Sequence, residues 1–66
     1  MKELVEKVLA RTGYPHLEAT ESNLIQVYLE YVNHGIFNEN AEEVQSLINS
    51  GEITIKRICN DLFSIR

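Results

Sequence analysis

The chain has 66 residues, ten acidic side chains against six basic ones, and a formal net charge of −4 at pH 7. A negative chain of this size is a poor ligand for the phosphate backbone of nucleic acid, and it has little room for a catalytic pocket. Its length predicts a single domain over residues 1–66 whose stability rests on the core, on helix caps or on self-association.

The cysteine content limits the chemistry further. Cys59 has no partner for a disulfide, and one cysteine with two distant histidines cannot assemble a zinc site. We therefore expect no metal and no cofactor. A lone thiol fits a reducing cytoplasm, and no segment has the pattern of a signal peptide or the length of a membrane span. The chain is predicted to be cytoplasmic, without a membrane partner.

The first predicted helix spans residues 2–12, where the apolar side chains recur along one narrow stripe. Gly13 supplies a C-cap, and Pro15 prevents the helix from continuing. In the connector that follows, Tyr14 and Leu17 are expected to pack onto the core.

The stretch from Thr20 to His34 is the most apolar part of the chain and is predicted to form the central helix. At 100° per residue its apolar side chains cover an arc of roughly 200°, well beyond the stripe of ~100° that a surface helix needs. Thr20 is a suitable N-cap, and Gly35 follows the last turn. A helix of this kind must contact neighbours on two sides, which are other helices of the chain, a second copy or a partner. The apolar residues are Leu24, Ile25, Val27, Tyr28, Leu29, Tyr31 and Val32.

Beyond the central helix, Ile36 and Phe37 form a short apolar pair that is expected to anchor the loop in the core. The third helix is predicted over residues 41–50, with one apolar face. Asn40 stands where its N-cap belongs, and Glu43 lies at the spacing of a capping box.

The last stretch of the chain carries two patterns. The β-branched run that begins at Ile53 alternates as a short strand would, which leaves residues 52–56 open between a strand and a helix start. Beyond it the apolar residues take a helical period, with Thr54 as N-cap and Ile53 and Ile58 as a hydrophobic staple. We favour the helix, which places Cys59 on the buried face as a small apolar side chain.

Together these segments predict an all-α fold, a compact bundle of four short helices around the central helix of residues 20–34. The three shorter helices each have a single apolar face, and three such faces are enough to cover the wide arc of the central helix. A core role for the central helix is therefore favoured over an exposed interface.

The charges are unevenly placed, because no lysine or arginine lies between Thr12 and Ile55. This middle region would attract a basic partner surface and repel nucleic acid. Part of its acidity is explained by helix starts, where the helix dipole favours a carboxylate. The acidic residues of this region are Glu18, Glu21, Glu30, Glu39, Glu42, Glu43 and Glu52.

The pattern favours a small acidic protein–protein interaction module that binds a basic surface of another protein. An adaptor or inhibitor of the kind found in bacteria and phages is one concrete form. The candidate protein-binding residues are Glu30, Glu39, Glu42 and Glu43. The sequence has no Gly-rich phosphate loop, no set of catalytic nucleophile and base, and no carboxylate pair with a supporting base, so no enzymatic activity is expected.

Two alternatives stay open. The first is a helix-turn-helix-like DNA-binding regulator that uses the helix pair of residues 41–63, with Lys56 and Arg57 as candidate nucleic-acid-binding residues. The negative net charge and Glu52 in the intervening turn count against it. The second alternative is a homodimeric structural protein in which the tyrosine-bearing central helices of two copies pack together.

Overall fold

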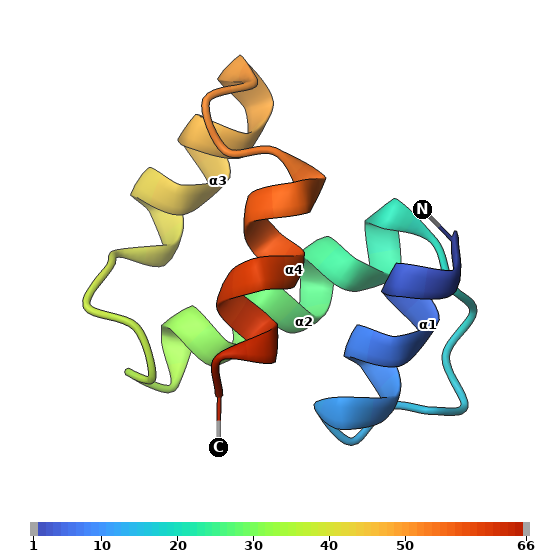
Figure 1. The fold of residues 1–66 in the computed structure, drawn as a ribbon. Coiled ribbons are helices and arrows are strands. Elements are labelled where there is room, and N and C mark those ends of the chain that lie inside the picture. The colour runs from blue at the N-terminus through green and yellow to red at the C-terminus, as the bar shows by residue number, and fades with distance from the viewer. Residues whose placement is uncertain (1, 66) are drawn as a thin grey trace.

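Four helices run through residues 2–65, the part of the chain that this computed structural model describes, and no strand occurs within that range (Figure 1). The predicted all-α fold is therefore confirmed. The segment before the last helix is a turn, so the interpretation of residues 52–56 as a helix start is also confirmed. The helices are α1 (Lys2–Arg11), α2 (Glu21–Asn33), α3 (Ala41–Ser50) and α4 (Ile55–Phe63).

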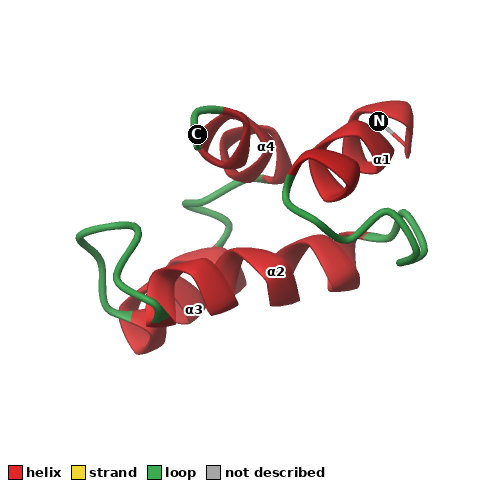
Figure 2. Cartoon of the chain, turned by 90° about the horizontal axis from the view of Figure 1, so that it is seen from below, coloured by secondary structure: helices red, strands yellow, loops and turns green. Residues whose placement is uncertain are grey.

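The helices form two layers, with α1 and α4 side by side in one and α2 and α3 in the other (Figure 2). Helix α2 contacts each of the other three, whereas α3 contacts α2 alone among the helices of residues 2–65. The prediction of α2 as the central helix is confirmed. Its Leu24 and Tyr28 are completely buried, because α1 and α4 cover one side of the wide apolar arc and α3 covers another.

The hydrophobic core draws on all four helices and on the turn before α4. Tyr28 is its largest buried side chain, and Phe37 packs its ring 5.3 Å from the ring of Tyr28. Tyr14 and Leu17 pack against the core from the connector, as predicted. Cys59 is completely buried on α4, and this burial raises the pKa of its thiol. The buried residues of the core are Val5, Val8, Leu9, Leu24, Val27, Tyr28, Val32, Val44, Ile53, Ile58, Cys59 and Leu62.

Local sequence signals account for where α2, α3 and α4 begin. Thr20, Asn40 and Thr54 each accept, through the side chain, a hydrogen bond from a backbone N–H in the first turn of the following helix, at 2.8 to 3.3 Å. All three predicted N-caps are confirmed. The capping box at Asn40 is formed in one direction: Asn40 accepts from the Glu43 N–H at 3.4 Å, but no return bond from the Glu43 carboxylate is present within residues 2–65.

Helices α1, α2 and α3 end in the same way, with a glycine in the left-handed region one or two residues after the helix. At the end of α2, Gly35 has φ +75°, and its N–H bonds to the carbonyl of Val32 at 3.1 Å. The next N–H, from Ile36, bonds to the carbonyl of Tyr31 at 3.2 Å, which completes a Schellman motif.

This chain reversal corrects one prediction. Ile36 is 51% exposed, so it does not anchor the loop, whereas Phe37 does pack on the core. Ile36 therefore does not make the apolar contact with the last turn of the helix that often accompanies a Schellman motif. The two adjacent apolar side chains thus point in different directions, and Phe37 alone of the pair contacts the core.

Candidate protein-binding surface

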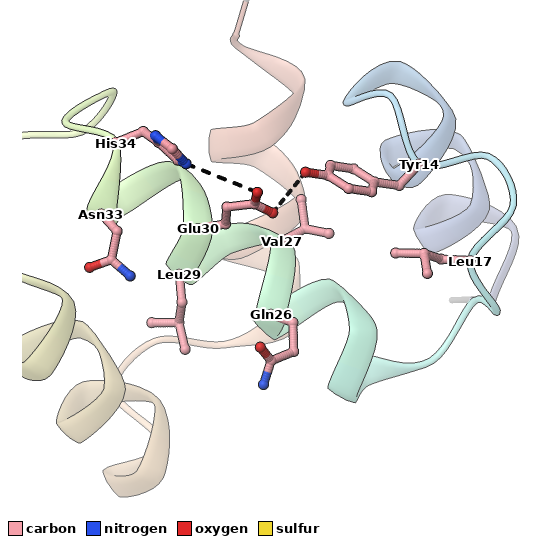
Figure 3. A pocket seen from close by; sticks show the side chains of 8 residues that line it. All are labelled: Tyr14, Leu17, Gln26, Val27, Leu29, Glu30, Asn33 and His34. Atoms are coloured by element: carbon pink, nitrogen blue, oxygen red, sulfur yellow. Dashed lines mark hydrogen bonds and ion pairs between the residues drawn. The ribbon is translucent and has the colours of Figure 1, made fainter.

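The outer face of α2 carries a small polar cluster next to the connector between α1 and α2. The Tyr14 hydroxyl donates a hydrogen bond of 2.7 Å to Glu30 Oε2. One turn further along α2, His34 Nε2 lies 4.0 Å from Glu30 Oε1, a contact that is an ion pair only when the imidazole is protonated. Figure 3 shows the tyrosine and the histidine approaching the carboxylate from opposite sides.

An open hollow of about 450 Å³ lies at this cluster, and we call it the α2 hollow. Apolar side chains from the connector and from α2 form part of its wall, and two side-chain amides, Gln26 before Glu30 and Asn33 after it, also project from α2 (Figure 3). Its lining consists of Tyr14, Glu30 and His34 together with Leu17, Val27, Leu29, Gln26 and Asn33.

The electrostatics of the α2 hollow are set by a single carboxylate. The hydrogen bond that the Tyr14 hydroxyl donates to Glu30 raises the pKa of this hydroxyl, and desolvation makes a smaller contribution. The tyrosine therefore stays a neutral donor at physiological pH. It orients the Glu30 carboxylate without cancelling its charge, and no lysine or arginine of residues 2–65 pairs with Glu30.

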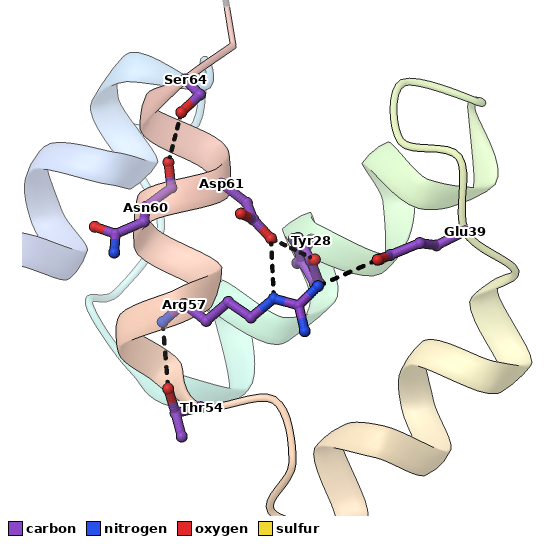
Figure 4. A network of polar contacts seen from close by, with 7 residues as sticks. All are labelled: Tyr28, Glu39, Thr54, Arg57, Asn60, Asp61 and Ser64. Atoms are coloured by element: carbon purple, nitrogen blue, oxygen red, sulfur yellow. Dashed lines mark hydrogen bonds and ion pairs between the residues drawn. The ribbon is translucent and has the colours of Figure 1, made fainter.

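A second polar group, the Tyr28 network, joins α2, α4 and the loop before α3 (Figure 4). The buried Tyr28 donates its hydroxyl hydrogen bond to Asp61 Oδ2 at 2.8 Å. Arg57 Nε lies 3.7 Å from the same oxygen, and Arg57 Nη2 lies 3.2 Å from Glu39 Oε1. Burial, and then the bond to Asp61, raises the pKa of Tyr28 far above its ordinary value.

The four predicted acidic residues are therefore distributed over three places. Glu30 lies in the α2 hollow, and Glu39 is neutralised by Arg57 in the Tyr28 network. Glu42 and Glu43 are exposed in the first turn of α3, where neither has an ion pair within the described range. The carboxylates do not converge on a common centre, and no group of three His, Cys, Asp or Glu residues among residues 2–65 is placed to hold a metal ion.

The two predicted basic residues also differ in their surroundings. Lys56 is exposed and has no ion pair among the residues described, whereas Arg57 is held by Glu39 and Asp61. The structure thus pairs Glu39, which the sequence predicted to bind a protein partner, with Arg57, which it predicted to bind nucleic acid. Asp61 lies four residues after Arg57 on α4, so the spacing of a helical ion pair was a signal for this contact. For Tyr14 beside Glu30 there was no local signal.

Comparison of the chain with known protein families, curated proteins and solved structures gives no match. Within residues 2–65, the helices are too short or too polar to cross a membrane. The functional interpretation therefore rests on the residues themselves.

Proposed function

We propose that this protein is a small cytoplasmic interaction module that binds a basic surface of another protein, as an adaptor or inhibitor of bacterial or phage type would. The observation that carries the proposal is a set of exposed carboxylates without a cationic neighbour. In the region between Thr12 and Ile55, only Glu39 is paired with a lysine or arginine among residues 2–65. Uncompensated charge of one sign steers a partner of opposite charge and sets the orientation in which it binds.

The start of α3 is the place to test this proposal. The variant E42Q/E43Q removes two carboxylates that have no partner in the described structure, while the Asn40 cap can still form. The matched control is E3Q/E6Q, which removes the same charge from exposed positions on α1. Both variants need a circular dichroism melt to show that the helices are intact.

The measurement is capture of partners from a cell lysate, followed by mass spectrometry and by titration of each purified partner at low and high salt. We expect basic partners that bind more weakly as salt rises, and weaker binding for E42Q/E43Q than for E3Q/E6Q. Equal binding by wild type and E42Q/E43Q at all salt concentrations would remove the acidic surface from the proposal.

A DNA-binding regulator is the second candidate, and one observation favours it. Helix α4 follows a short turn and exposes Lys56, Arg57 and Asn60, residue types that contact phosphates and base edges in the major groove. The Tyr28 network opposes this function, because Arg57 would have to leave both Glu39 and Asp61 before it could contact DNA.

The variant E39Q tests the DNA-binding candidate directly, because it removes one of the two carboxylates that hold Arg57. If α4 reads DNA, E39Q should bind a fluorescent duplex more tightly than wild type, with an affinity that falls steeply with salt. No change in anisotropy for either protein at low salt rules this candidate out.

For the third candidate, a homodimer, the tyrosine-bearing face of α2 is already occupied. Tyr28 is completely buried, and the hydroxyl of the half-buried Tyr31 donates to the carbonyl of Thr12 at 3.0 Å. Both rings therefore pack against the chain's own core, and among residues 2–65 Ile36 is the large apolar side chain that remains exposed for a second copy.

A further inference from the structure

We propose that the α2 hollow is the pocket in which this module receives an arginine side chain of its protein partner, with Glu30 as the anchoring carboxylate. This inference rests on the proposed function and identifies the position and the chemistry of its central contact. Four observations support it: the position of Glu30 on α2, the state of its carboxylate, the walls of the hollow and the lack of a competing cation.

The position of Glu30 is not explained by helix stability. Glu21, Glu42 and Glu43 lie in first turns, where the helix dipole favours negative charge. Glu30 lies in the last turn of α2, where the same dipole disfavours a carboxylate and where no basic residue of the helix offsets it. Among these four acidic residues, Glu30 is the one whose charge is destabilised by the dipole of its own helix. A cation from a partner would compensate for this destabilisation.

The carboxylate is also held ready for a ligand. Its Oε2 accepts the Tyr14 hydrogen bond at 2.7 Å, which fixes the side chain, while Oε1 has only the 4.0 Å contact with His34. The Glu30 side chain is 47% exposed. An oriented, charged and accessible oxygen loses little conformational entropy on binding. Glu39 is the contrasting case, because Arg57 already occupies its carboxylate.

The walls of the hollow match the rest of an arginine side chain. The partly buried Leu17 lies on the Tyr14 side of the carboxylate (Figure 3), where it can cover the aliphatic stem. Tyr14 adds an aromatic ring to the lining of the hollow, and a guanidinium stacks on such a ring better than an ammonium does. The hollow of about 450 Å³ is open to solvent and is large enough to hold one long side chain.

The experiment uses the full-length protein labelled with ¹⁵N and the peptide acetyl-Gly-Arg-Gly-amide as the probe, followed by amide chemical shifts. We expect the largest shifts at Tyr14, Leu17 and Glu30. The same peptide with citrulline in place of arginine keeps the shape and loses the charge, and it should produce no shifts. The corresponding peptide with lysine in place of arginine should bind more weakly. Free arginine, added as a further ligand, shows whether the hollow binds the side chain alone or needs the peptide backbone.

The variant E30Q should weaken binding of the arginine peptide about tenfold or more, the change expected when a charge-assisted hydrogen bond is lost. The matched control, E42Q, removes an exposed carboxylate outside the hollow and should bind as wild type does. Y14F keeps the ring and releases Glu30, so it should fall between the two. Melting curves establish that all three variants fold.

Two results would contradict the proposal that the α2 hollow binds an arginine side chain. Shifts spread over the acidic surface, with E42Q as harmful as E30Q, would mean unspecific attraction. Equal affinity of E30Q and wild type would mean that Glu30 is not the anchor. The outcomes also separate the two proposals: if E42Q/E43Q loses its partners while E30Q keeps them, the interaction module stands and the pocket fails. If neither variant loses a partner, the module itself fails.

Discussion

The variant Y28A is expected to lose about 3–5 kcal/mol of unfolding free energy, the usual cost of deleting a buried aromatic ring. A domain of this length has a total stability of about 3–10 kcal/mol, so Y28A should lose a large part of it and unfold at a much lower urea concentration than the wild type. The ring of Tyr28 is completely buried on the central helix and packs against Phe37. Its removal leaves a cavity where α2, α4 and the loop before α3 meet.

Urea denaturation followed by circular dichroism measures this effect, and Y28F is the matched control. Phenylalanine keeps the ring but cannot donate to Asp61, so Y28F should cost only about 1 kcal/mol, the net contribution of one hydrogen bond. Asp61 keeps its contact with Arg57 in this variant, which limits the loss. If Y28A and Y28F were equally stable, the hydroxyl would matter and the packing of the ring would not.

Alkaline pH should destabilise the protein through the same residue. The pKa of Tyr28 is raised because burial, and then the hydrogen bond to Asp61, favours the neutral hydroxyl in the folded state. In the unfolded chain the tyrosine titrates near pH ~10. The stability that Tyr28 contributes is therefore fully present below that pH and is lost progressively as the pH rises toward the folded-state pKa.

We expect the urea midpoint of the wild type to fall between pH 9 and pH 11, and tyrosinate absorbance at 295 nm to rise together with unfolding. Y28F should show a shallower decline over this range. A smaller decline should remain, because the Glu30 hydrogen bond also raises the pKa of Tyr14 and burial raises the pKa of Cys59. Identical midpoint curves for wild type and Y28F would contradict the assignment to Tyr28.

The predictability of this fold has a physical basis in short-range interactions. Helix periodicity and caps depend on residues within four positions of one another, so Thr20, Asn40 and Thr54 could be identified as caps from the sequence. The width of the apolar arc on residues 20–34 likewise identified the central helix. Ile36 shows the limit, because its exposure depends on the path of the chain after Gly35 rather than on its own apolar character.

The candidate site was less predictable, because its contacts join residues that are distant in sequence. Tyr14 and Glu30 are 16 positions apart, and Tyr28 and Asp61 are 33 positions apart. No periodicity links such pairs; they meet only because the helices pack in two layers. The sequence therefore identified Glu30 as an acidic surface residue but not the tyrosine that orients it.

The way in which α3 is attached to the rest of the molecule determines how far it can reorient when a partner binds. Among the helices of residues 2–65 it contacts α2 alone, and Val44 is its one fully buried side chain. The Arg57–Glu39 ion pair is a polar tie between α4 and the loop that leads into α3. The lowest-energy opening of the molecule would therefore release α3, while α1, α2 and α4 keep a shared core. The carboxylates at the start of α3 would then belong to a segment that can reorient as a partner docks, whereas Glu30 stays on the rigid core as a fixed reference point.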